Sequence, residues 1–202
     1  MEKTIGFIGV GHIGGALARH FAGAGYQVIL SNSRGKASLT ELANAIGANA
    51  RAADAHEALN ADIIVLSVPW SKLEATLQAP TEWNGKIVID TTNNILATSP
   101  TLQLADLDSR TTGERVTELI PTAQIVKAFN TLYYKILEQS PLEGGGNRVI
   151  VLSGDDAQAK AKVADLIISI GFVPVDLGGL KFGCRLQDIG GPFSSLNLVK
   201  VR

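Results

Sequence analysis

Three glycines near the amino terminus have the spacing of a phosphate-binding turn. They stand in the run Gly9-Val10-Gly11-His12-Ile13-Gly14, which follows the apolar stretch 4–8 and precedes the helix-forming stretch 15–24. Between a strand and a helix, the first glycine permits a tight turn, the second lets the backbone approach a pyrophosphate, and the third allows close helix–strand packing. The phosphates would lie against the free N–H groups that begin the helix. This position disfavours the alternative, a glycine-rich turn that binds nothing.

The residues after the second apolar stretch select the cofactor. An NAD site usually places Asp or Glu about 20 residues beyond the glycines, where it binds the ribose 2′-hydroxyl. This chain instead has Ser31-Asn32-Ser33-Arg34-Gly35-Lys36, which contains no acid. Arg34 can hold a 2′-phosphate with its planar guanidinium, and Ser33 can donate a hydroxyl hydrogen bond. We therefore predict that the chain binds NADP(H), against the alternative of an ordinary basic turn.

Three later strand ends carry polar and aromatic side chains. Their sequences are Ser67-Val68-Pro69-Trp70, Asp90-Thr91-Thr92-Asn93-Asn94 and Lys127-Ala128-Phe129-Asn130-Thr131. Ligands of open parallel sheets bind beyond the carboxyl ends of the strands, so each segment would face the cofactor crevice. Each also has a structural explanation, because Asp90 and Thr91 could cap a helix, Trp70 could lie in the core, and Lys127 could be solvated.

These elements alternate along the chain. Apolar, often β-branched runs predict strands at 4–8, 27–30, 62–68, 86–90, 124–129, 148–152 and 172–175. Helices are predicted at 15–24, up to residue 59 after Asp54, at 116–120 after the capping box Thr111-x-x-Glu114, and at 157–170 after Asp155 or Asp156. We expect 97–113 to be a loop, with a short helix as an alternative within it. The pattern predicts an α/β fold of the Rossmann type, with a doubly wound, mostly parallel sheet and helices on both faces, in a single domain of residues 1–202.

Taken together, the segments resemble one family. The glycine loop, N-S-R-G, S-V-P-W, I-D-T-T-N, V-K-A-F-N-T, and G-D-D followed by G-F-x-P-V-D-L-G are similar, in order and spacing, to the NADP oxidoreductases dependent on coenzyme F420, an 8-hydroxy-5-deazaflavin. The resemblance extends nearly to Leu180. It implies a small Rossmann domain, usually a homodimer, that passes hydride between NADP(H) and the deazaflavin or a related ring such as a flavin.

The resemblance also implies roles for single residues. By it, Val10 to Ile13 would hold the pyrophosphate, Ser33, Arg34 and Lys36 the 2′-phosphate, and Val68, Pro69 and Ala128 the nicotinamide and the acceptor ring. With the strand-end residues added, the predicted cofactor-binding set is Gly9, Val10, Gly11, His12, Ile13, Gly14, Asn32, Ser33, Arg34, Lys36, Val68, Pro69, Trp70, Asn93, Ala128 and Asn130. The segment 178–202 is expected to complete the acceptor site or a dimer interface, because its apolar residues have no evident helix partner in the chain.

No catalytic acid or base is predicted. Hydroxy-acid dehydrogenases need a general acid, whereas a ring that accepts hydride at one carbon can draw its proton from solvent. The three histidines (His12, His20 and His56) all lie in the cofactor half of the chain. Tyr133 and Tyr134 are expected to pack against the sheet. The scarcity of proton donors favours a ring acceptor.

Composition limits the class further. Of 202 residues, 46% are hydrophobic and 18% charged, with a net charge of −1, so we expect a globular protein with no general attraction to nucleic acid or acidic membranes. The amino terminus leads directly into the first strand and no apolar run is long enough for a bilayer, so we expect a cytoplasmic location. Cys184 stands alone and is expected to be buried rather than reactive, and no Cys/His metal cluster is visible.

Three functions stay open at this stage. The first is an NADPH-dependent reductase of a deazaflavin, a flavin, a quinone or a ferric chelate. The second is a relative of β-hydroxyacid dehydrogenases or imine reductases, although those normally carry a large helical second domain and only about fifty residues follow Gly154 here. The third is a non-catalytic NADPH sensor.

Overall fold

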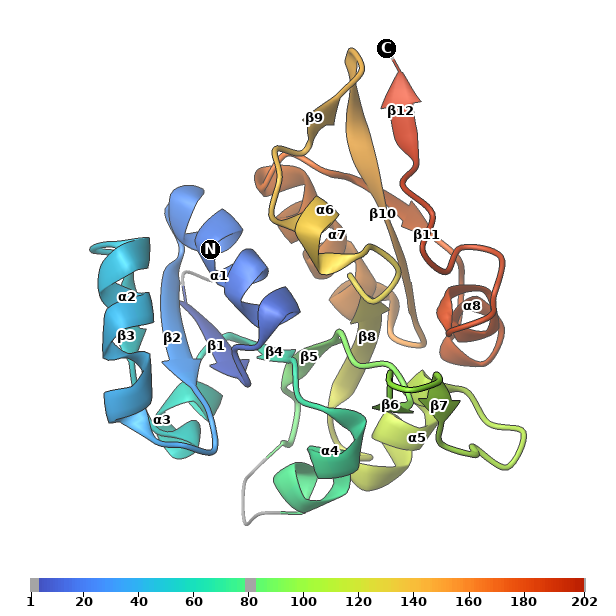
Figure 1. Cartoon of the computed structure of the whole chain (residues 1–202), viewed down its shortest axis with the longest axis horizontal. Coiled ribbons are helices and arrows are strands. Elements are labelled where there is room, and N and C mark those ends of the chain that lie inside the picture. Colours follow the sequence, from blue (N-terminus) through green and yellow to red (C-terminus); the bar gives the residue numbers. More distant parts are fainter. Residues whose placement is uncertain (1–3, 79–82, 202) are drawn as a thin grey trace.

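The predicted strands form one sheet in the computed structural model, which describes residues 4–78 and 83–201 (Figure 1). Its main path has the order β11-β10-β8-β5-β4-β1-β2-β3. The strands are β1 (Thr4–Ile8), β2 (Gln27–Ser31), β3 (Ala50–Ala52), β4 (Ile63–Leu66), β5 (Ile87–Asp90), β8 (Gln124–Ala128), β10 (Gly146–Gly154) and β11 (Val173–Asp176). Neighbours on this path run parallel except β8 and β10, which are antiparallel. The mostly parallel sheet confirms the predicted fold class.

Helices cover both faces of the sheet and bury two separate apolar clusters. The first face carries α1 (His12–Gly23), α2 (Thr40–Ile46), α6 (Tyr134–Leu137) and α7 (Ala157–Ser169). The second face carries α3 (Ala55–Leu59), α4 (Trp70–Leu77), α5 (Thr112–Leu119) and α8 (Leu180–Gln187). A short 3-10 turn, η1 (Lys36–Leu39), precedes α2. No helix in the described part of the chain is long and apolar enough to span a membrane.

Alternation along the strands divides their side chains between the two clusters. Ile5 and Phe7 of β1 lie in the first cluster, whereas Ile8 lies in the second. In β4, Val65 faces the first cluster and Leu66 the second. Strands buried on both faces have continuous apolar sequences, which is why these runs were recognisable.

The helix starts confirm the predicted caps. The Asp54 side chain accepts from the Glu57 N–H at 2.8 Å, and Thr111 and Glu114 form the full capping box of α5. Of the two candidates before α7, Asp156 is the cap, since it accepts from the Ala159 N–H at 2.8 Å. Asp155 instead accepts from the Leu180 N–H at 2.9 Å, at the start of α8.

One segment differs from its prediction, and the fold of the last residues had not been predicted. The stretch 97–113, predicted to be a loop, contains part of the hairpin β6 (Ile95–Ala97) and β7 (Gln103–Leu104) and the start of α5. The last residues form α8 and β12 (Val199–Val201), and β12 pairs with β10 together with β9 (Leu142–Glu143). These three strands form an antiparallel ribbon beyond the parallel part of the sheet (Figure 1). Elements of two or three residues are too short to show a hydrophobic period, so they could not be predicted from the sequence.

Candidate cofactor site

The glycine loop has the geometry that a phosphate-binding turn requires. Gly9 has φ +91°, and a Cβ atom there would lie 2.2 Å from the carbonyl oxygen of Ser67. A Cβ atom on Gly14 would lie 2.6 Å from the Gly9 carbonyl oxygen, so strand and helix approach closely there. A Cβ atom on Gly11 would meet nothing within 4 Å, which leaves its backbone accessible to a ligand. The three glycines therefore occupy positions that match their predicted roles.

The start of α1 presents backbone donors to that open space. Gly11 is the N-cap and supplies no side-chain cap, and the first turn contains no acid. The positive end of the helix dipole is therefore unopposed by local negative charge, which favours an anion. Val10 and Ile13 pack against the first core cluster, so they support the loop, and His12 is exposed beside it.

The turn after β2 is held by Asn32. Its Oδ1 atom accepts from the Arg34 N–H at 2.8 Å, and its Nδ2 atom donates to the Ser38 hydroxyl at 3.0 Å. Asn32 therefore shapes the turn, while Ser33, Arg34 and Lys36 project into solvent. Among the residues that the structure describes, no carboxylate forms an ion pair with Arg34. Its guanidinium is thus available to an external anion.

Residues at the ends of β4 and β8 occupy different environments. Val68 and Trp70 are half-buried and pack against the edge of the second core cluster, whereas Pro69 is exposed. Trp70 begins α4 and lines a small cavity of about 160 Å³ together with Asp106 and Arg115. Ala128 is fully buried in the first core cluster, so its side chain does not line an open ring site. The predicted contact of Ala128 with the nicotinamide is therefore not supported by its position.

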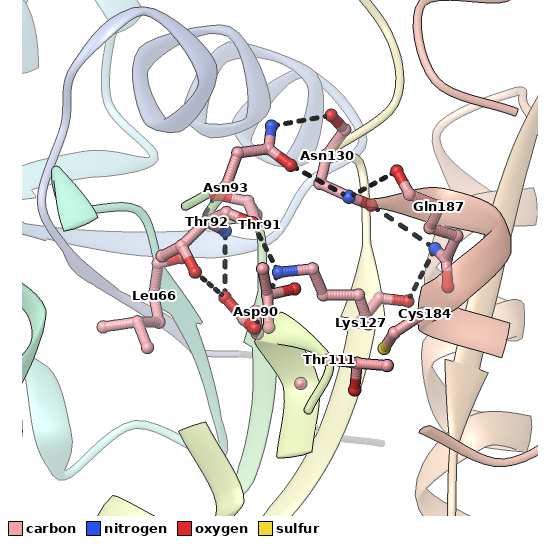
Figure 2. A network of polar contacts seen from close by, with 12 residues as sticks. Leu66, Asp90, Thr91, Thr92, Asn93, Thr111, Lys127, Asn130, Cys184 and Gln187 are labelled. Atoms are coloured by element: carbon pink, nitrogen blue, oxygen red, sulfur yellow. Dashed lines mark hydrogen bonds and ion pairs between the residues drawn. The ribbon is translucent and has the colours of Figure 1, made fainter. Parts of the chain in front are cut away.

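A buried ion pair joins the ends of β5 and β8 (Figure 2). The Lys127 ammonium lies 2.9 Å from Asp90 Oδ2 and also donates to the Thr92 carbonyl, and both charged side chains are fully buried. Asp90 Oδ1 accepts from the backbone N–H and the hydroxyl of Thr92, at 2.9 and 2.7 Å. Lys127 is therefore not solvated and Asp90 caps no helix. Together they fix the turn that follows β5.

Beyond this pair, an amide network reaches the C-terminal helix. Asn93 Nδ2 donates to the Asn130 carbonyl at 3.0 Å, and Asn130 Nδ2 donates to Asn93 Oδ1 and to the Gln187 carbonyl, each at 3.1 Å (Figure 2). Gln187 in turn donates to the Val151 carbonyl at 3.2 Å and accepts from the Ser153 hydroxyl at 2.6 Å. Asn130 and Gln187 are buried, so Asn93 is the only one of the three amides that is partly exposed.

Cys184 lies on the buried face of α8. Its sulfur lies 3.4 Å from the Ser153 hydroxyl. Burial raises the pKa of the Cys184 thiol to about 11, outweighing the nearby Lys127 charge and the Ser153 hydrogen bond, which lower it. The thiol is therefore protonated at neutral pH. This confirms the expectation of a small buried residue rather than a reactive one.

The two tyrosines after β8 do not pack against the sheet, so that prediction was wrong. The Tyr134 ring stacks on the His12 ring, with centroids 4.1 Å apart and planes 21° apart. The Tyr133 ring lies edge-on to Tyr134 at 4.7 Å and is 53% exposed. The physical reason is the path of the chain, which turns at Phe129 (φ +64°) and carries both rings to the glycine loop.

No group of three His, Cys, Asp or Glu side chains that could hold a metal ion occurs within residues 4–78 and 83–201. Gln187 and Ser153 are polar residues of this network that sequence reasoning missed. Neither belongs to a recognised motif, and a glutamine on the buried face of a short helix gives no indication of its partners.

Comparison with known proteins agrees with this geometry. Residues 4–94 match the sequence model of the family described as NADP oxidoreductase, coenzyme F420-dependent. Among curated proteins, the chain is 26% identical over 186 residues to metalloreductase STEAP3 of Rattus norvegicus, covering 92% of this chain and 36% of the relative. The chain thus spans about a third of the length of the curated relatives that it matches first.

Two solved structures are similar over most of the chain. A hypothetical protein of Sinorhizobium meliloti superposes with a TM-score of 0.91 at 42% identity, covering 99% of this chain and 96% of that one. A protein of Arthrobacter sp. FB24, described as a candidate F420-dependent NADP-reductase, superposes with a TM-score of 0.78 at 25% identity, covering 89% and 86%. The family match includes the glycine loop, the turn after β2 and the end of β5, but it does not extend to the end of β8 or to α8. Over residues 4–94, this chain is therefore similar to the NADP oxidoreductases described as coenzyme F420-dependent.

Proposed function

We propose that the protein is an NADPH-dependent reductase that passes hydride to a planar ring acceptor, such as a deazaflavin or a flavin. The observation that carries this proposal is the state of the ionisable groups at the strand ends. Lys127 and Asp90 are fully buried and form an ion pair with each other. Neither of these two charged side chains is therefore free to act as a general acid or base, which disfavours chemistry that needs one of them as a positioned proton donor.

The residues fit NADPH, which supplies a hydride from its nicotinamide ring when bound. The first-turn amides of α1 would bind the pyrophosphate, because the space over Gly11 is open and no acid opposes an anion there. Arg34, Ser33 and Lys36 would bind the 2′-phosphate from the exposed turn. The half-buried Val68 and the partly exposed Asn93 amide would lie beside the nicotinamide.

The contribution of the protein to the rate would be positional. Holding two rings in contact removes most of the entropic cost of the encounter. A ring that accepts hydride at one carbon takes its proton from solvent, so no side chain has to deliver it. The Asp90–Lys127 pair and the Asn93–Asn130 amide pair keep the turn after β5 rigid, which fixes one wall of the ring site.

The test is NADPH oxidation by the purified protein against a panel containing a deazaflavin, riboflavin, a quinone, ferric citrate and a cyclic imine. The loss of nicotinamide absorbance measures turnover. We expect turnover with the deazaflavin or riboflavin. Turnover with the imine alone would assign the protein to the imine reductase class instead. Tight NADPH binding without any turnover would refute the proposal in favour of an NADPH sensor.

A ferric chelate is the second candidate acceptor, because the chain resembles a protein named as a metalloreductase over 92% of its own length. A hydride carries two electrons, whereas Fe³⁺ accepts one. Reduction of ferric citrate would therefore need a ring that receives the hydride and releases electrons singly. We expect ferric citrate to be reduced only when riboflavin is added, and reduction without added flavin would contradict this sequence of steps.

We also propose that the protein is a homodimer. Several apolar side chains on the β9–β10–β12 ribbon and on the segment just before β12 are exposed, namely Leu142, Leu196, Leu198 and Val201. Large apolar side chains left exposed on one ribbon are often covered by another chain. Light scattering at micromolar concentration should give twice the monomer mass of 21.3 kDa. A monomeric mass would contradict the proposal.

A further inference from the structure

The segment that follows β8 crosses the part of the site where the nicotinamide is proposed to lie. In the sheet order, β5 and β4 stand between β8 and β1. Residues 129–134 leave the carboxyl end of β8 and end against His12, which follows β1. They therefore pass over the carboxyl ends of β5 and β4. The hydrogen bond from Asn93, just after β5, to the Asn130 carbonyl supports this path.

The crossing segment is anchored at several points. Phe129 and Leu132 are buried in the core, and Leu137 at the end of α6 is fully buried. The Thr131 carbonyl accepts from the Ser195 N–H at 2.9 Å, and the Leu137 carbonyl accepts from the His20 ring at 2.6 Å. Side chains that leave this segment are therefore held on a fixed backbone.

Three aromatic rings extend from the glycine loop along this segment. His12 stacks on Tyr134, and Tyr134 meets Tyr133 edge to face. Tyr133 is the outermost ring and is 53% exposed. A scattered exposed aromatic residue needs no explanation. This one is different because it is held through two further rings against the cofactor loop, in the segment that comes from the end of β8.

We propose that the Tyr133 ring is the surface on which the acceptor heterocycle stacks, and that Tyr134 and His12 hold it in place. The proposal rests on the proposed function and identifies the acceptor as a planar aromatic ring. Proteins commonly bind planar heterocycles on exposed aromatic side chains, because stacking requires a flat π face and little else. The ring of Tyr133 is therefore essential and its hydroxyl is not.

The first experiment compares Tyr133→Leu with Tyr133→Phe in NADPH oxidation with riboflavin as acceptor. We expect Tyr133→Leu to raise the KM for riboflavin about tenfold, in the range of a lost base–aromatic stack, while Tyr133→Phe stays within about twofold of wild type. The dissociation constant for NADPH should be unchanged in both variants. Phe182→Leu is the matched control, since Phe182 is 66% exposed on α8 and lies outside the three-ring group. It should change neither constant.

The second experiment needs no turnover. Riboflavin is titrated calorimetrically into the protein loaded with NADP⁺, and its dissociation constant reports stacking on the ring at position 133. Similar dissociation constants in wild type and Tyr133→Phe, with a weaker one in Tyr133→Leu, support the proposal even if the true acceptor is another ring. An unchanged KM and an unchanged dissociation constant in Tyr133→Leu would overturn it, while wild-type turnover would still support the proposed function. A weaker affinity for NADPH in Tyr133→Leu would also overturn it, because Tyr133 would then contact the cofactor.

Discussion

Replacement of Arg34 by alanine tests the cofactor assignment with few assumptions. The Arg34 backbone N–H is bound by Asn32 Oδ1 at 2.8 Å, and this bond does not depend on the side chain. The substitution should therefore leave the turn in place. Arg34 is exposed and pairs with no carboxylate of the described residues, so its removal should cost little folding stability. Any loss would appear in ligand binding.

The size of that loss follows from the position of the side chain. A hydrogen bond to a charged group contributes roughly 1.5–3 kcal/mol. Because the Arg34 guanidinium is exposed, water and salt compete for it, and we expect the lower part of this range, about 1.5–2 kcal/mol. That corresponds to an affinity for NADPH roughly 10–30 times weaker. NADH has no 2′-phosphate, so its affinity should stay nearly unchanged.

Calorimetric titration of wild type and Arg34→Ala with both cofactors gives the four constants that are needed. Arg185→Ala is the control, because it removes the same charge from an exposed position on α8. In kinetics, the loss should appear in the KM for NADPH and not in kcat, since the phosphate is bound equally in ground and transition states. If wild type prefers NADH, or if Arg34→Ala weakens both cofactors alike, the assignment of this turn is wrong.

Three further predictions concern the scaffold. Lys127→Met should lower the free energy of unfolding by about 3–5 kcal/mol in urea titration, because it leaves Asp90 charged and buried. The double variant with Asp90→Asn should lose less stability than the sum of the losses in the two single variants. Gly9→Ala should destabilise the fold, since its Cβ would lie 2.2 Å from a carbonyl oxygen, whereas Gly11→Ala should fold normally and weaken NADPH binding; equal melting temperatures for the two variants would contradict this. The pKa of Cys184 is raised to about 11 in the folded state, so its alkylation by iodoacetamide at pH 8 should be at least ~100-fold slower than in urea-unfolded protein. For the same reason, the free energy of unfolding should fall as the pH rises from about 9 to about 11. Rapid alkylation of the native protein would refute the burial argument.

The parts of the fold that were predictable are those with strong local causes. Each of the seven predicted strands is present, because strands buried on both faces need continuous apolar runs. The caps at Asp54, Thr111 and Asp156 were visible because capping needs a short polar side chain just before a helix. The glycine loop was visible because close packing and left-handed backbone restrict its positions to glycine.

The parts that were missed depend on contacts between distant segments. Whether Tyr133 and Tyr134 face the sheet or α1 is decided by the turn at Phe129, whose positive φ is rare for a residue with a side chain. The role of Gln187 depends on the approach of α8 to β8 and β10, and no pattern within residues 180–187 indicates it. Likewise, the burial of Ala128 follows from the helices that cover β8 on the α1 face.

The buried ion pair is an intermediate case, because both charged residues were visible in the sequence but their pairing was not. Asp90 ends the apolar run of β5, and Lys127 stands near the end of the next apolar strand. In the parallel pairing of β5 and β8, these two residues are register partners. Two opposite charges at one register position of neighbouring buried strands cannot both remain unpaired, because burying either charge alone is too costly. The strands had to be placed side by side before this constraint could apply. Once they are, the same constraint removes both groups from acid–base chemistry, and this is the physical basis for our proposal of a ring acceptor.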